Sequence, residues 1–181
     1  MDKRKEANQR VKKAITDAIF DLLETQSLSD ITITSIINRA GVARISFYRN
    51  YASKEDVLIR LIRDILDDFR ETADYDISNV YSRHHLHRVF SYFDKYRFYV
   101  INLVKSGYSM MLINELNAFH ESIAGDMSIR SKERYRLYIY IGALCNAVFF
   151  WLSTGAPESV DDMVDVILQN LSHNNEGDIE S

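Results

Sequence analysis

Residues 31–54, which read ITITSIINRAGVARISFYRNYASK, decide how the rest of this chain is interpreted. Gly41 lies between two short helix signals, and glycine readily adopts the positive φ that ends a helix. Thr32 is a good N-cap for the first of these helices, and Ser53 is placed to cap a third helix. The segment therefore predicts three closely spaced helices.

The helix that follows Gly41 has an outer face that combines hydroxyls, cations and an aromatic ring. Its periodicity turns Phe47 inward, and Val42 and Tyr51 complete the buried side. The outward side chains are then Arg44, Ser46, Tyr48 and Arg49. Hydroxyls and cations bind phosphates and base edges, so this face suits contact with a nucleic acid.

Amphipathic helices are predicted on both sides of this segment. The earlier helix has one apolar stripe at helical spacing, formed by Val11, Ala14, Ile15, Ala18, Ile19, Leu22 and Leu23. The later helix has a second stripe, formed by Val57, Leu58, Leu61, Ile62, Ile65, Leu66 and Phe69. Its length makes this later helix the predicted link between a helical head and a larger body.

Composition favours a soluble helical protein. The 181 residues are 46% apolar and 27% charged, with six glycines and one proline, so tight turns are few and a many-stranded sheet is disfavoured. The sequence after residue 80 continues with helical periodicity and without hairpin signals. We therefore predict an all-α fold.

Charge is distributed unevenly along the chain. Residues 1–54 contain ten lysines and arginines against six acidic residues, a net charge of +4, whereas the remaining residues carry −8. A basic head on an acidic body is typical of local attraction to a polyanion, although a chance distribution of solvated charge gives the same count. Lys3, Arg4 and Lys5 fit either a flexible arm that contacts the nucleic acid or a solubilising tail.

The sequence predicts a cytoplasmic protein without membrane contact. The single cysteine, Cys145, cannot form an intramolecular disulfide and fits a reducing compartment. The N-terminus lacks the apolar core of a secretory signal. The most apolar run, residues 137–152, is shorter than the roughly 20 residues that span a bilayer, so we interpret it as a buried helix.

The last two helix signals predict an interface between two copies of the chain. Residues 137–152 are apolar on nearly all sides and need cover on more than one face. A four-helix interface would use Phe149, Leu152, Val160, Met163, Val164, Ile167, Leu168 and Leu171. The alternative is that both helices only complete the core of the single chain.

Several motifs at fixed spacing lie within residues 8–66. They are Ile31-Thr32-Ile33 opening one helix, Ala40-Gly41-Val42 ending it, Phe47-Tyr48 followed by Tyr51, and Ser53-Lys54-Glu55-Asp56 opening the long helix. Together these motifs resemble the TetR family of bacterial transcriptional regulators. The remaining residues resemble the family only in their helical character and in the two-helix ending.

The resemblance implies a homodimer that inserts one helix of each subunit into successive major grooves of a palindromic operator. It also implies a small-molecule effector that binds in the body and changes the spacing of the two heads. The DNA-binding residues carried over are Thr32, Thr34, Tyr48 and Lys54 at phosphates, and Arg44, Ile45 and Ser46 at base edges, with Arg49 beside them. We accordingly expect a helix-turn-helix DNA-binding domain at 1–53, an effector-binding and dimerisation domain at 54–173, and a disordered tail at 174–181.

Three positions depart from the family pattern. Ala43 stands where a capping serine or threonine is usual, which costs about 1 kcal/mol of helix stability. Ile45 replaces a small residue and suits contact with a thymine methyl group. Asn50 replaces a histidine or an aromatic residue. These departures leave the base preference open.

Candidate sites in the body rest on weaker patterns. Polar or adaptable groups fall within apolar helices and could orient an effector, although aromatic residues at helical spacing are more often core; these groups are Tyr99, Met111, Glu115, Tyr138 and Asn146. His84, His85 and His87 suggest a metal, but the flanking arginines oppose a cation and no further ligand is near. We predict no metal and no cofactor, and interpret Cys145 as an inert core thiol.

The predicted function is that of a homodimeric DNA-binding repressor that a small-molecule effector releases from its operator. The alternative is a co-activator or interaction protein of the same fold that reaches DNA through a partner regulator. An enzyme is not expected, because the sequence contains no glycine-rich phosphate loop, nucleophile elbow or complete set of metal ligands.

Overall fold

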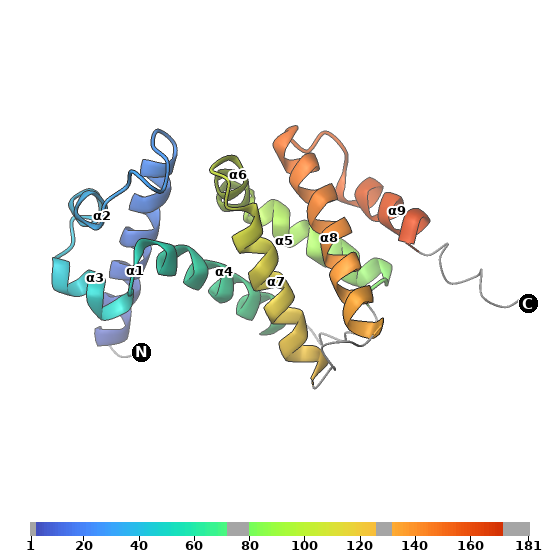
Figure 1. The fold of residues 1–181 in the computed structure, drawn as a ribbon, viewed down its shortest axis with the longest axis horizontal. Coiled ribbons are helices and arrows are strands. Elements are labelled where there is room, and N and C mark those ends of the chain that lie inside the picture. The colour runs from blue at the N-terminus through green and yellow to red at the C-terminus, as the bar shows by residue number, and fades with distance from the viewer. Residues whose placement is uncertain (1–2, 72–79, 126–131, 172–181) are drawn as a thin grey trace, which may run out of the picture. The chain divides into compact units, whose positions relative to one another are not determined.

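The computed structural model describes residues 3–71, 80–125 and 132–171, with side chains as far as Asn170. These residues form helices joined by turns and contain no strand, which confirms the predicted all-α fold (Figure 1). The helices are α1 (Lys3–Leu23), α2 (Ile33–Ala40), α3 (Arg44–Asn50), α4 (Lys54–Glu71), α5 (Arg83–Lys95), α6 (Arg97–Lys105), α7 (Ser109–Ala124), α8 (Lys132–Ser153) and α9 (Val160–Leu171).

The chain divides into two compact units. Unit 1 comprises residues 1–68 and 102–115, and unit 2 comprises residues 69–101 and 116–181. Three helices, α4, α6 and α7, therefore pass from one unit into the other. The functional boundary predicted after residue 53 stays a prediction, and the tail predicted at 174–181 lies outside the described residues.

The core of unit 1 is built from the predicted apolar stripes. Ile15, Ile19 and Phe20 of α1 are fully buried, and Val57 and Leu58 of α4 are buried with them. Burial of one such side chain stabilises the fold by about 1.5–3 kcal/mol, so these helices hold the head together. Outside this core, the exposed Arg39 of α2 donates two hydrogen bonds to the carboxylate of Asp21 on α1 (2.8 and 3.0 Å).

The ends of α2 follow from local chemistry and confirm the prediction. The Thr32 hydroxyl accepts a hydrogen bond from the Ser35 backbone N–H (3.0 Å), and the Thr32 N–H donates to the Ser35 hydroxyl (3.1 Å). This reciprocal capping box fixes where α2 begins. Gly41 ends it with φ 64°, a left-handed conformation that a side chain would strain.

The start of α4 is also capped as predicted. The Ser53 hydroxyl accepts a hydrogen bond from the Asp56 N–H (3.1 Å), and the Asp56 carboxylate accepts one from the Ala52 N–H (2.8 Å). At the other end of unit 1, α1 begins at Lys3. The exposed basic side chains Lys3, Arg4 and Lys5 thus lie on a helix and not on the flexible arm suggested by the sequence.

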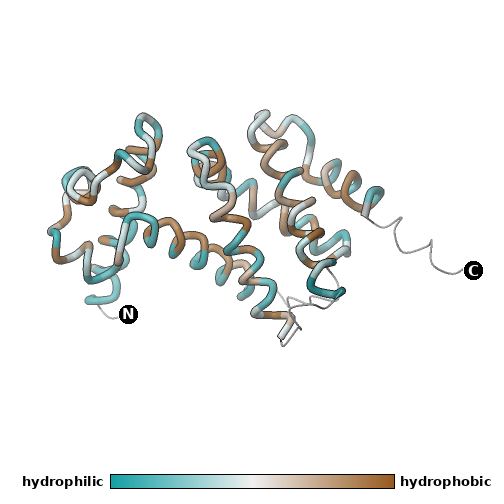
Figure 2. Tube along the Cα trace, in the orientation of Figure 1, coloured by the Kyte–Doolittle hydropathy of each residue, from teal (hydrophilic) through white to brown (hydrophobic). Residues whose placement is uncertain are grey.

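Unit 2 is a helical body whose core lies around α8. Tyr140, Val148 and Trp151 of α8 are buried, and α9 packs along α5. The indole N–H of Trp151 donates to the Glu158 carbonyl (3.0 Å), which ties the turn between α8 and α9 to the core. Figure 2 shows apolar residues along much of α8, whereas polar and apolar positions alternate along α9.

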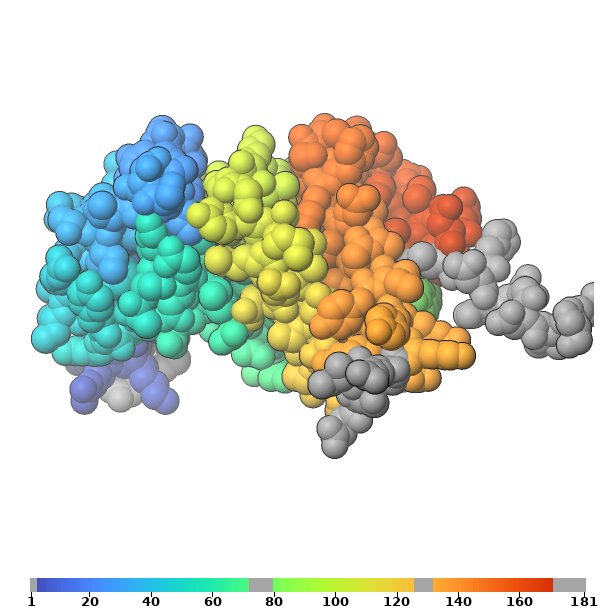
Figure 3. Space-filling model, viewed as in Figure 1, coloured from blue at the N-terminus to red at the C-terminus, as the bar shows by residue number. Residues whose placement is uncertain are grey.

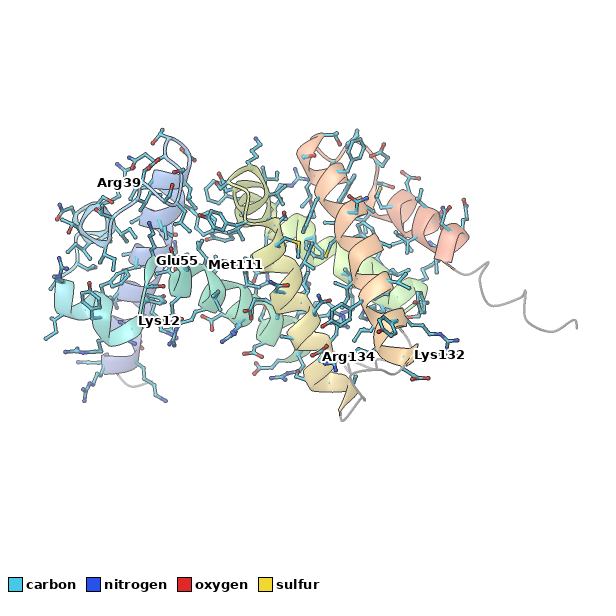
Figure 4. The ribbon with its side chains drawn as sticks, viewed as in Figure 1. Lys12, Arg39, Glu55, Met111, Lys132 and Arg134 are labelled. Carbon is cyan, nitrogen blue, oxygen red and sulfur yellow. The ribbon has the colours of Figure 1, made fainter. Side chains whose placement is uncertain are left out.

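By length and composition alone, one helix among the described residues, α8, could cross a membrane. The core helix of a soluble protein meets the same criterion, and 44% of the most apolar part of α8 is buried within the protein. The helix begins with three charged side chains, of which Lys132 and Arg134 are labelled in Figure 4. Arg134 forms an ion pair with Glu121 of α7 (2.6 Å).

Candidate nucleic-acid interface

The outer surface of α2 and α3 brings together most of the residues predicted to contact DNA. Thr32, Thr34, Arg44, Ile45, Tyr48 and Arg49 are exposed, and Ser46 is half-buried. They belong to α2, to α3 and to the N-cap of α2, all within the blue-to-cyan part of the surface in Figure 3. Phe47, the inward residue of α3, is fully buried and anchors this short helix to α1 and α2.

Arg44 is held in place by its neighbours. One guanidinium nitrogen lies 3.5 Å from the Thr34 hydroxyl of α2, and another lies 3.4 Å from the Tyr48 hydroxyl one turn further along α3. The guanidinium also lies over the Tyr48 ring, 5.5 Å from its centroid. Tyr48 in turn packs edge-on against the buried Phe47. These contacts restrict the guanidinium, and a restricted guanidinium loses less entropy when it forms a bidentate contact.

Among the described residues of unit 1, Ile45 is the most exposed large hydrophobic side chain, at 69% of its full area. An isoleucine at the tip of a polar helix face gains nothing from water, and a thymine methyl group is an apolar partner of suitable size in the major groove. Asn50, by contrast, is buried, and its side-chain amide donates to the Ser46 carbonyl (2.9 Å). Asn50 therefore stabilises the end of α3 and is turned away from the surface.

Ala43 precedes α3 in an extended conformation (φ −70°, ψ 146°) and provides no side-chain cap. Because this is the backbone geometry of an N-cap, Ala43→Ser is expected to stabilise the protein by about 1 kcal/mol, or to raise the melting temperature by about 2–4 °C. Calorimetry measures this shift. Thr32→Ala, which removes an existing cap, is the matched control and should lower the melting temperature by a similar amount. A lower melting temperature for Ala43→Ser would contradict the expected capping.

Lys54, predicted to contact phosphate, has intramolecular partners at the N-terminus of α4. Its ammonium donates hydrogen bonds to the backbone carbonyls of Leu28, Ser29 and Ile31, with distances of 3.1 Å to Ser29 and 2.7 Å to Ile31. Those carbonyls belong to the turn between α1 and α2, more than twenty residues earlier in the chain. A pattern along the sequence does not predict such a contact, because the partners are far apart in the chain. Figure 4 marks the neighbouring Glu55 at the start of α4.

The sequence of residues 15–61 matches the profile of a family described as bacterial regulatory proteins, tetR family. This match covers α2, α3 and most of α1, together with the first part of α4. Residues 15–61 therefore have the sequence pattern of the N-terminal region of TetR-family regulators.

Solved structures share the fold of more than nine-tenths of the chain. A TetR transcriptional regulator from Streptococcus agalactiae is 21% identical, with 92% of this chain and 96% of that chain covered and a TM-score of 0.64. Lin0861 from Listeria innocua is 13% identical, with 96% and 94% covered and a TM-score of 0.73. The dihydroxyacetone kinase operon activator DhaS is 16% identical, with 91% and 95% covered and a TM-score of 0.54. No curated protein matches the sequence.

The residues predicted to bind an effector are divided between the two units of the chain. Met111 and Glu115 belong to unit 1, whereas Tyr99, Tyr138 and Asn146 belong to unit 2. Glu115 accepts two hydrogen bonds from Arg63 of α4 (2.6 and 3.2 Å). Tyr138 and Asn146 are exposed on α8. Neither unit by itself brings the five residues into one site.

Most residues predicted at the dimer interface are covered by their own chain. Leu152, Met163, Val164 and Ile167 are between 0% and 8% exposed. The apolar stripe of α9 faces α5 within unit 2. Phe149, Val160 and Leu168 are half-buried, and the side chain of Leu171 lies outside the described residues. Side chains that are already buried offer little surface to a second copy. The predicted interface stays a prediction.

One face of α8 does offer such a surface. We define the α8 stripe as Tyr135, Ile139, Gly142, Ala143, Asn146 and Phe150, which share a face about 100° wide and are all exposed. Ile139 and Phe150 are 67% and 71% exposed. A Cβ added at Gly142 would meet no atom within 4 Å. Large apolar side chains without cover on a chargeless stripe are typical of a protein interface.

The histidine cluster and the cysteine of the chain have different environments. His84 and His87 are exposed on α5, whereas His85 is buried against Phe69, with ring centroids 6.0 Å apart. Burial lowers the pKa of His85 to about 4, and positive charge on His120, Arg88 and His84 acts in the same direction. Cys145 is buried in α8, and burial raises the pKa of its thiol to about 12, which disfavours the reactive thiolate.

Proposed function

We propose that this protein is a TetR-family regulator, a homodimeric repressor that binds a palindromic operator and is released by a small-molecule effector. The proposed binding to DNA is supported by the exposed face of α2 and α3. On this face Arg44 contacts Thr34 and Tyr48, and Ile45 is exposed beside them. Arg44 would read a base edge, Ile45 a thymine methyl group, and the surrounding hydroxyls would bind phosphates.

The proposed dimer uses the α8 stripe. From Tyr135 to Phe150 the stripe extends for about 22 Å along the helix, enough for a long helix-to-helix contact. Gly142 and Ala143 lie near its middle, and small residues there let two helices approach closely. A second copy is the partner that such a self-complementary surface favours, because a two-fold axis places the same stripe on both sides.

The proposed response to an effector is a shift in population. An effector would favour a dimer in which the separation of the two heads no longer matches two half-sites on DNA. Physical continuity supports this coupling, because α4, α6 and α7 each run from unit 1 into unit 2. Unit 1 also contains the ion pair between Arg63 of α4 and Glu115 of α7, which links two of these helices.

A gel shift tests the proposed function directly. Purified protein is incubated with a library of random duplexes, and the retained duplexes are selected through several rounds. Enrichment of a palindromic sequence bound by the protein alone supports direct operator binding. A protein that is dimeric by light scattering but enriches no sequence would contradict it, and would favour the co-activator that reaches DNA through a partner. The name of the structurally similar DhaS, an operon activator, shows why the sign of regulation needs its own reporter assay.

Arg44→Ala is expected to weaken binding to the selected operator about tenfold or more and to relax the base preference at one position in each half-site. Binding to a duplex of random sequence should change little, because the lost contact is to a base. Fluorescence anisotropy with both duplexes measures the effect. Arg39→Ala is the control, since that exposed guanidinium on α2 is paired with Asp21. Equal losses on both duplexes for Arg44→Ala would show that Arg44 contacts phosphate.

A further inference from the structure

The first residue of α4 occupies an unusual environment for a cation at a helix N-terminus. The helix dipole is positive there and disfavours a lysine, so Lys54 needs a compensating negative partner. No carboxylate is paired with it among the contacts of the described residues; three backbone carbonyls accept its hydrogen bonds instead. The ammonium has three donors, so this contact uses its full hydrogen-bonding capacity.

The three carbonyls belong to a turn with its own internal order. The Ser27 hydroxyl hydrogen-bonds the Ser29 hydroxyl (2.6 Å) and the Asp30 carboxylate (2.6 Å), and the Ile31 N–H donates to the Ser27 carbonyl (3.2 Å). The flanking Leu28 and Ile31 side chains are 0% and 1% exposed. The turn therefore presents its carbonyls in a fixed arrangement that a compact cation can fill.

The turn ends at the first residue of the DNA-reading surface. Ile31 is followed by Thr32, the N-cap of α2. An ammonium bound to the Ile31 carbonyl thus ties the start of α4 to the start of α2. A displacement of the N-terminus of α4 would move the α1–α2 turn and Thr32 with it, because breaking the contact would leave three carbonyls without their donor.

We propose that Lys54 is a positioning residue, which sets the start of α2 relative to α4 and does not itself bind phosphate. The inference rests on the proposed DNA-binding function for its effect on affinity, but the intramolecular contact stands without it. In this role Lys54 transmits the placement of α4 to the surface that carries Thr32, Thr34 and Arg44.

Two substitutions separate this role from phosphate binding. Lys54→Met keeps the aliphatic stem and removes the ammonium. Lys54→Arg keeps the positive charge and binds phosphate at least as well as lysine, but a planar guanidinium does not fit three carbonyls that converge on one point. We expect both variants to lower the melting temperature in the absence of DNA by roughly 5 °C. A Lys54→Arg variant with unchanged melting temperature would overturn the proposal.

The DNA arm of the experiment uses the selected operator and a random duplex of equal length, well below the melting temperature. We expect Lys54→Met to lower operator affinity about tenfold and affinity for the random duplex by a smaller factor, because the surface that Lys54 positions contains both base-reading and phosphate-binding residues. The dependence of log K on log salt concentration should keep its slope. Loss of a direct phosphate contact would instead weaken binding to both duplexes by the same factor and reduce the slope by about 0.9 per subunit. Either that result or unchanged affinity for both duplexes overturns the positioning role.

Arg49→Met provides the matched control. Arg49 is an exposed cation on α3, so its loss should reduce the salt slope while the melting temperature stays the same. If no duplex is enriched by the wild-type protein, the proposed function fails, whereas the melting temperatures of the two Lys54 variants still test the contact with the turn. The two failures are therefore distinguishable.

Discussion

Gly142→Arg is expected to convert the protein from a dimer to a monomer without disturbing the fold of the single chain. The α8 stripe is exposed, and a Cβ at Gly142 meets no atom of its own chain within 4 Å, so a long side chain there has room in the monomer. Arginine also favours a helix over glycine by about 0.8 kcal/mol. In the proposed dimer the same side chain would place two buried charges where two helices approach most closely.

Light scattering across a range of concentrations measures the change in mass, and circular dichroism checks that the helices are retained. Operator affinity should fall about a hundredfold or more, because two linked heads bind more tightly than one. Gly142→Ala is the matched control and should stay dimeric, since a methyl group adds little bulk. A dimeric Gly142→Arg protein would place the interface elsewhere and contradict the use of the α8 stripe.

The second large effect is a loss of folding stability at acidic pH. We expect the protein to lose about 3 kcal/mol of stability between pH 6.5 and pH 4 because of His85 alone. Its pKa is about 4 in the folded protein and 6.5 in the unfolded chain. In this window the unfolded state binds a proton that the folded state does not, so stability falls as the pH falls. Above pH 6.5, where His85 is neutral in both states, protonation of His85 no longer lowers the free energy of unfolding. Burial also lowers the pKa of His120, which adds to the loss in the same direction.

Urea unfolding at several pH values between 4 and 7 measures this dependence. His85→Phe keeps a ring against Phe69 and removes the titrating group, so its stability should change less with pH than that of the wild type. His84→Gln is the control, because His84 is exposed on the same helix and should leave the pH dependence unchanged. A His85→Phe variant with the full pH dependence would assign the effect to other groups.

The features that sequence predicted well depend on residues within one or two helical turns. The cap of α2 needs only Thr32 and Ser35, and its end needs only Gly41. The inward Phe47 and outward Arg44 follow from periodicity within α3. In each case the deciding interactions join residues close in sequence, so the local pattern carries the information. The resemblance to the TetR family rests on these same local motifs and is confirmed by the family match.

The sequence did not identify the packing partner of a residue or helix face that could contact several other surfaces. The stripe of α9 required cover, but periodicity could not say whether α5 or a second copy supplies it; Met163, Val164 and Ile167 are buried within their own chain. The contact of Glu115 with an effector stays a prediction; the partner that the structure shows for it is Arg63, which is 52 residues away. An amphipathic pattern states that a face will be buried and leaves its partner open.

For this protein, the sequence by itself determined the all-α class, the helix ends of the head and the outward face of α3. Only the tertiary structure decided that Lys54 binds carbonyls 23 to 26 residues earlier, and that Ile139 and Phe150 on one face of α8 are exposed whereas Met163, Val164 and Ile167 of α9 are buried. The physical reason is the range of the interactions. Caps and periodicity act along one helix, whereas the partner of a long side chain or an apolar face depends on how separate helices pack.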